Sequence, residues 1–126
     1  MYLYVKPHGR IEGFQDIQES HIKIFHAAFK HSLSKVLIDA RDVEGELSAT
    51  DRCKFGEFLS RELRREPAAR KVAALRLAYI VVQPVLDPRR FVETVARNRG
   101  VPIKTTESID EALEWLGENE VNNNLA

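Results

Sequence analysis

The sequence predicts an α/β fold in which a mostly parallel β-sheet is covered by helices. Short, β-rich apolar runs alternate along the chain with segments whose apolar residues recur every three or four positions. One of these runs, Val36-Leu37-Ile38, is continuously apolar, which is typical of a strand buried on both faces. Strands that alternate with helices in this way form parallel sheets covered by helices.

The first strand is predicted at Leu3-Tyr4-Val5, and a turn at Pro7-His8-Gly9 should follow it before a further extended segment through Ile11. A helix comes next, for which Asp16 is the expected N-cap and Glu19 its capping-box partner. The residues expected on the inward face of this helix recur at spacings of three and four: Ile22, Phe25, Ala28, Phe29 and Leu33.

The second helix is predicted to begin at Ser48, because Ser48 and Asp51 have capping-box spacing. Its apolar residues share one face and are expected to point inward: Phe55, Phe58, Leu59 and Leu63. Pro67 should end it. A β-rich run between Val72 and Val82 then predicts a further strand, without marking where the strand starts or stops.

The last third of the chain predicts a helix from Asp87-Pro88 to Gly100 and a short strand at Val101-Pro102-Ile103. The proline favours an edge position for this strand, since it cannot donate to a neighbour. A final helix, with Ser108 and Glu111 at capping-box spacing, should end at Gly117. Its expected inward residues are Ile109, Ala112, Leu113 and Leu116, and Trp115 should pack against the sheet or a helix.

Length and composition limit the class of protein. The 126 residues suit one domain, which we place at 1–117, followed by a polar tail at 118–126 that we expect to be disordered. Lys and Arg equal Asp and Glu at 19 each, which argues against a dedicated nucleic-acid binder. The single cysteine, Cys53, allows no internal disulfide and favours a cytoplasmic setting. No signal peptide and no segment long enough for stable membrane insertion is recognisable.

The sequence contains no recognisable cofactor or metal motif. None of its six glycines has the spacing of a phosphate-binding loop, and we expect no cofactor. His21, His26 and His31 are five residues apart, so neighbours diverge by ~140° around a helix axis and do not converge on a metal. We expect these histidines to face solvent or to be partly packed.

Three groups of residues are candidates for a functional site. Asp39 follows a buried strand at its carboxyl end, where ligands bind in parallel sheets, although an acid that accepts backbone N–H bonds there is favoured. Ser48 is either a helix cap or a hydroxyl at a place that favours a phosphate. The outer side of the third predicted helix is basic and could bind an anion or simply be solvated: Arg89, Arg90, Arg97 and Arg99.

Three segments carry a resemblance to a known family. "KVLIDARDVEGELSATDR" resembles the central strand and following helix of the SpoIIAA-like STAS domains, also called STAS/SEC14-like. "FVETVARNRGVPIKTTESIDEALEWLG" resembles their C-terminal helix, strand and helix, and "GRIEGFQDIQES" falls at a matching place. The resemblance implies a sheet of four or five strands flanked by about four helices, and a binding or switching module that is not an enzyme.

In bacterial anti-sigma-factor antagonists of this superfamily, a partner kinase phosphorylates a serine in an aspartate-serine-serine-glycine motif at the start of the second helix. The matching region here reads "ELSATDRCKFG"; Ser48 and Thr50 lie near that position, but the motif is absent. We therefore expect Ser48 to act as a cap. The resemblance implies an interaction surface formed by Asp39, Glu46, Ser48, Thr50 and Asp51.

Three functions follow as hypotheses, of which an enzyme is a distant third. The favoured one is a non-enzymatic module that binds a protein partner or a second copy of itself. The alternative is a carrier of a small apolar molecule or lipid, suggested by the kinship of STAS domains with the SEC14 and CRAL-TRIO lipid-transfer domains. A closed core would favour the first hypothesis, whereas a dry pocket of at least a few hundred Å3 would favour the second.

Overall fold

The computed structural model describes residues 1–45, 47–65, 75–82 and 102–118, and its order of elements confirms the α/β class. The elements are β1 (Leu3–Val5), β2 (His8–Arg10), α1 (Phe14–Lys30), β3 (Lys35–Asp39), β4 (Asp42–Glu44), α2 (Ala49–Arg65), β5 (Arg76–Ile80), β6 (Ile103–Thr106) and α5 (Ile109–Leu116). The helix predicted between 87 and 100 lies outside the described residues.

Four strands form a parallel sheet in the order β1-β3-β5-β6. The central pair, β3 and β5, is aligned so that Val36 lies beside Leu77 and Ile38 beside Tyr79. β6 lies at one edge, as the proline predicts, and Pro102 still contributes its carbonyl oxygen to the N–H of Leu77. The strand starts at Ile103, at the end of the segment expected to be extended, and continues to Thr106.

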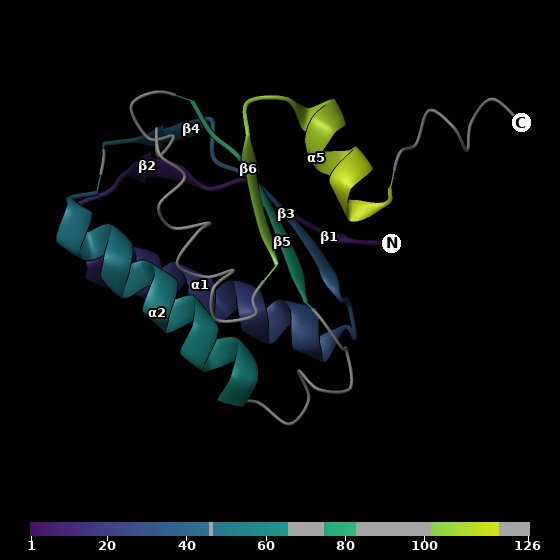
Figure 1. Ribbon diagram of the computed structural model, residues 1–126, viewed down its shortest axis with the longest axis horizontal. Coiled ribbons are helices and arrows are strands. Elements are labelled where there is room, and N and C mark those ends of the chain that lie inside the picture. Colours follow the sequence, from purple (N-terminus) through teal and green to yellow (C-terminus); the bar gives the residue numbers. More distant parts are fainter. Residues whose placement is uncertain (46, 66–74, 83–101, 119–126) are drawn as a thin grey trace, which may run out of the picture.

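Helices cover this sheet on both faces. α1 and α2 lie on one face and α5 on the other (Figure 1). Alternate residues of each central strand enter the two cores, as the continuous run at 36–38 predicts: Val36 and Ile38 join α1 and α2, whereas Leu37 joins α5. α2 places Phe55, Phe58 and Leu59 in the core as predicted.

The turn predicted at Pro7-His8-Gly9 is wrong. His8 to Arg10 form β2, which pairs in parallel with β4 and makes a second, two-stranded sheet. The N–H of Ile11 continues this pairing with a 2.9 Å bond to the Glu44 carbonyl oxygen. Local turn propensity is overridden because the backbone groups of this segment find partners more than thirty residues away.

The N-cap predicted for α1 is also wrong. The helix begins two residues before Asp16, with Gly13 at the cap position. Asp16 lies inside the first turn, and its carboxylate accepts a 2.9 Å bond from the backbone N–H of Glu12. The acid therefore still stabilises the start of the helix, but it does so from within the first turn, where a negative charge is favoured.

The inward face of α1 is rotated from the prediction. His21, Ile24, Phe25 and Ala28 are buried, whereas Ile22 is 43% exposed. The buried set has helical spacing once His21 is counted with the apolar residues, and the polar character of histidine hides this pattern in the sequence. The expectation that the histidines are solvent-facing or partly packed therefore fails at His21.

α5 is held at both ends. Ser108 Oγ accepts from the N–H of Glu111, and Gly117 ends the helix in the left-handed conformation at φ 78°, both as predicted. Ile109, expected to face inward, is 37% exposed. Glu118, the first residue of the segment expected to be a tail, accepts 2.9 Å bonds from Lys35 Nζ and the Met1 amine, which lower its pKa.

Trp115 packs against the α5 side of the sheet, and the Arg76 guanidinium lies over its ring at 4.4 Å. The ring is only half-buried, so we expect Trp115→Ala to lower the free energy of unfolding by about 2 kcal/mol, less than the ~3–5 kcal/mol for a fully buried ring. Chemical denaturation would measure it, with Trp115→Phe as the milder control. A loss below about 0.5 kcal/mol would show that the ring contributes no packing.

Candidate functional site

A cavity of about 250 Å3 lies at the carboxyl ends of β3 and β5, between the sheet, α1, α2 and the β2–β4 pair. We call it the sheet-end cavity. Its inner wall is mostly apolar and includes Ile17, Ile38, Ala40, Phe55 and Val81. The carboxyl end of a parallel sheet is where α/β proteins bind ligands.

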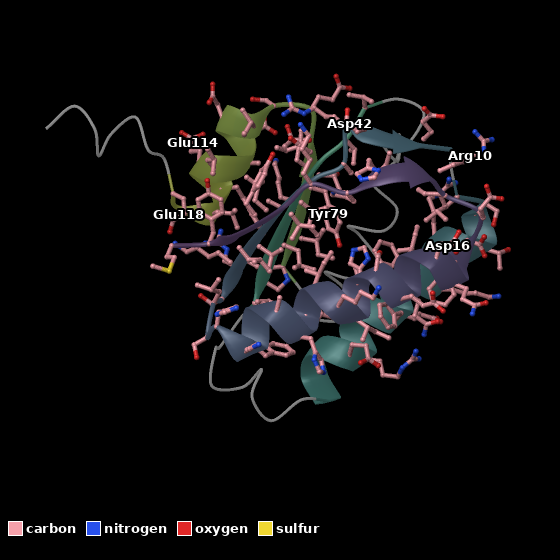
Figure 2. All side chains as sticks on the ribbon, turned by 180° about the vertical axis from the view of Figure 1, so that it is seen from behind. Arg10, Asp16, Asp42, Tyr79, Glu114 and Glu118 are labelled. Carbon is pink, nitrogen blue, oxygen red and sulfur yellow. The ribbon has the colours of Figure 1, made fainter. Side chains whose placement is uncertain are left out.

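The cavity has a polar outer rim. Figure 2 shows Arg10 and Asp16 at one end of the molecule, with Tyr79 further inside, between the sheet and α1. Arg52, from the first turns of α2, also lines the cavity, and its Nη1 donates a 2.7 Å bond to the Leu47 carbonyl oxygen. Charged side chains therefore lie at the rim of the cavity, and mostly apolar ones in its inner wall.

The inner wall contains a buried hydrogen bond between His21 and Tyr79. His21 Nε2 lies 2.7 Å from the Tyr79 hydroxyl oxygen, and the two side chains are 7% and 8% exposed. His21 Nδ1 lies 2.9 Å from the carbonyl oxygen of Ile17, one turn earlier in α1. Because a carbonyl oxygen can only accept, Nδ1 carries the ring proton; Nε2 of the neutral ring then accepts from the Tyr79 O–H.

The surroundings keep both groups neutral. Burial lowers the pKa of His21 from 6.5 to about 4, although the bond to the Ile17 carbonyl oxygen opposes this, and burial raises the pKa of Tyr79. Aromatic rings surround the imidazole: Phe55 is edge-on with its centroid at 4.7 Å, and Phe25 lies at 5.9 Å. At neutral pH the pair is an imidazole and a phenol, and neither carries charge.

Asp39 does not face the sheet-end cavity. It is fully buried at the end of β3, and its carboxylate accepts from Arg41 Nε at 2.9 Å and Nη2 at 2.6 Å and from the Tyr4 hydroxyl at 3.1 Å. These bonds, chiefly those from Arg41, lower the pKa of Asp39 to about 2. The Arg41 N–H also donates at 3.3 Å, as the structural interpretation predicts. Asp39 itself is out of reach of a partner, but both side chains that bond to it lie near the surface: Tyr4 is 47% exposed, and the Arg41 side chain is 43% exposed.

The other predicted site residues lie near the start of α2. Ser48 Oγ accepts a 3.1 Å bond from the N–H of Asp51, which confirms its role as the cap, and Ser48 and Thr50 are exposed. Glu46 lies outside the described residues, as do all four arginines of the predicted anion site: Arg89, Arg90, Arg97 and Arg99. The structure therefore brings Ser48, Thr50 and Asp51 together on one helical turn, with Asp39 apart from them in the interior.

Sequence reasoning missed His21 and Tyr79. A usable signal exists for His21, since Ile17, His21, Ile24 and Ala28 follow one helical stripe. Tyr79 lies within a β-rich run that was recognised, but nothing local indicates that its hydroxyl meets a residue 58 positions earlier. The cavity itself depends on the pairing of β2 with β4, which the predicted turn concealed.

Within the described ranges, no group of His, Cys, Asp and Glu side chains is arranged to hold a metal ion. In the same part of the chain, no helix combines the length and the apolar character needed to cross a bilayer. A search of protein-family models found no match to this chain, and neither the curated proteins nor the solved structures gave one. The STAS resemblance therefore stays a prediction.

The shifted pKa values predict how stability depends on pH. At pH well above 6.5, His21 is neutral in both the folded and the unfolded state. As pH falls from 6.5 toward 4, His21 becomes protonated in the unfolded chain but stays neutral in the folded protein. The free energy of unfolding therefore falls, by about 2 kcal/mol between roughly pH 7 and pH 5. Asp39 adds a loss only at lower pH, between 3.8 and about 2.

Urea denaturation at a series of pH values would measure this dependence. His21→Leu should flatten the curve between about pH 7 and pH 5, whatever its effect on stability at neutral pH. His26→Leu is the matched control, because His26 is exposed on the same helix and the curve should keep its slope. An unchanged slope in His21→Leu would show that His21 is not the group responsible for the loss of stability between pH 7 and pH 5.

Proposed function

We propose that the protein binds a small, predominantly apolar molecule in the sheet-end cavity. The observation that carries the proposal is the cavity itself, about 250 Å3 at the carboxyl ends of β3 and β5, with a mostly apolar inner wall that also holds the His21–Tyr79 pair, and with a polar rim. Ligand sites in proteins commonly have this character: mostly apolar walls with a small number of placed polar groups. This favours the ligand carrier that the sequence left as the alternative.

The volume limits the ligand. Pockets for drug-sized molecules measure about 300–1,000 Å3, so this cavity is suited to something smaller. It offers roughly the space of eight molecules of liquid water, enough for an organic molecule of about ten non-hydrogen atoms. A long lipid chain would need the cavity to extend beyond the described residues.

A binding role is proposed rather than a catalytic one. An efficient general acid or base has a pKa near the working pH, whereas burial moves the pKa values of His21 and Tyr79 away from neutral pH. The pKa of His21 is lowered to about 4 and that of Tyr79 is raised, so neither exchanges a proton readily at neutral pH. Their hydrogen bond is suited to orienting a bound molecule.

We also propose that the fold is a STAS/SEC14-like variant in a cytoplasmic protein. The sequence resemblance supports this, together with a parallel sheet that carries helices on both faces. The kinship with lipid-transfer domains that this resemblance implies agrees with an apolar ligand. The hypothesis that the third predicted helix binds an anion is supported by its sequence pattern of arginines alone.

A second candidate function is contact with a protein partner through the start of α2. The exposed hydroxyls of Ser48 and Thr50 favour it, since both project from one surface turn. This turn adjoins the cavity, because Leu47 and Arg52 line the cavity on either side of Ser48 and Thr50. A partner there could respond to whether the cavity is filled.

Native mass spectrometry of protein purified from its own host tests the first function. We expect wild-type protein to carry a mass of a small organic molecule that is lost on denaturation. Val43→Trp, which adds a large side chain on the β4 wall, should remove this adduct. Leu113→Trp is the matched control, because Leu113 is half-buried on the α5 side, and its adduct should remain. Wild-type protein without any adduct, and without affinity for small apolar probes, would refute the proposal.

Ser48 separates a helix cap from a phosphorylation switch. Ser48→Ala should lower the free energy of unfolding by ~1 kcal/mol, since the Asp51 N–H loses its acceptor. Ser48→Asp keeps an acceptor and adds a charge that the helix dipole favours, so its stability should equal or slightly exceed that of wild type. Thermal denaturation would compare the two.

A phosphate on Ser48 would meet the Asp51 carboxylate and be repelled, so we expect Ser48 to be unmodified in the cell. Phosphopeptide mapping of protein from the host measures this directly. A substantial phosphorylated fraction at Ser48 or Thr50 would overturn the expectation and favour a switch at the start of α2.

A further inference from the structure

We propose that the ligand of the sheet-end cavity presents a hydrogen-bond donor, a hydroxyl or a ring N–H, to the Tyr79 hydroxyl oxygen. This inference rests on the proposed function and specifies which kind of polar group the ligand carries where it meets Tyr79. It follows from the direction of the hydrogen bonds in the chain Tyr79–His21–Ile17.

The direction is set at the Ile17 end. The Ile17 carbonyl oxygen can only accept, so the proton of the neutral imidazole lies on Nδ1, 2.9 Å away. Nε2 is then an acceptor, and the Tyr79 hydroxyl, 2.7 Å away, must donate its single hydrogen to it. The opposite arrangement would place an unprotonated Nδ1 against the carbonyl oxygen, two acceptors facing each other at 2.9 Å.

With its hydrogen committed, the Tyr79 oxygen offers the cavity only an acceptor. Among the described residues, His21 is the hydrogen-bond partner of this hydroxyl. The pair cannot readily reorient, because both side chains are buried and Phe25 and Phe55 confine the imidazole. A ligand donor is therefore matched at this point, whereas a ligand acceptor faces a second acceptor with no hydrogen between them.

Indole and benzofuran are suitable probes. They share one bicyclic shape, but indole has an N–H where benzofuran has an ether oxygen. Isothermal titration of the folded wild-type protein at neutral pH should show indole binding about tenfold more tightly than benzofuran, the usual effect of one buried hydrogen bond to an uncharged group. In Tyr79→Phe the preference should vanish, with benzofuran affinity within about twofold of wild type.

His21→Leu provides an independent variant if Tyr79→Phe fails to fold. It frees the Tyr79 hydrogen, so the hydroxyl can donate or accept, and benzofuran should approach indole in affinity. His26→Leu, exposed on the same helix, should keep the wild-type preference. Equal binding of both probes to wild type would overturn this inference while supporting the proposed function. Binding of neither probe would overturn the proposed function and the inference with it.

Discussion

The structure depends on covering β3 and β5 on both faces. Each strand has five residues, and their side chains alternate between two separate cores, one under α1 and α2 and the other under α5. A parallel pair of this kind is stable only when both faces are covered, because the middle residues of the two strands, Val36-Leu37-Ile38 and Leu77-Ala78, present apolar side chains to both faces. On the α1 and α2 face, β2 and β4 complete the cover at the carboxyl ends of the strands, and the sheet-end cavity is the space that remains beneath them. The candidate site is therefore a product of how the sheet is enclosed.

The hydrogen bond between His21 and Tyr79 has a structural role within this enclosure. It joins the middle of α1 to β5 inside a largely apolar core, where an unpaired imidazole or phenol would cost free energy. Because the Ile17 carbonyl oxygen holds the other ring nitrogen, a shift of α1 along or around its axis would leave polar atoms without partners. A polar pair of this type contributes little net stability but distinguishes the native packing from near alternatives. Because this hydrogen bond is fixed in one direction, the Tyr79 oxygen always faces the cavity as an acceptor.

The fold class was predictable because it depends on local signals: the caps at Ser48 and Ser108, the glycine after α5, and the apolar run at 36–38. The β2–β4 pair was not predictable from the sequence. It forms from two three-residue segments that are far apart in the sequence and carry no apolar pattern of their own. Of the candidate site, the sequence located the carboxyl end of β3 correctly but selected Asp39, whose carboxylate is used internally by Arg41 and Tyr4. The groups that line the cavity come from several elements, so no single stretch reveals them. His21 was misjudged because a histidine reads as polar even where its two nitrogens are both bonded.

The position of Trp115 affects how the protein can be observed. It is the chain's single tryptophan, and it packs, half-buried, against the core between α5 and the sheet, whereas the sheet-end cavity lies on the opposite face of the sheet. Its emission reports on the environment that Arg76 and the neighbouring α5 core provide. A molecule that enters the cavity and leaves the sheet unmoved would leave this signal unchanged, so intrinsic fluorescence would record the unfolding of the α5 layer and remain blind to occupancy. Tyr79, which lies in the cavity wall, is the natural spectroscopic reporter, through its ultraviolet absorption or the resonances of its ring.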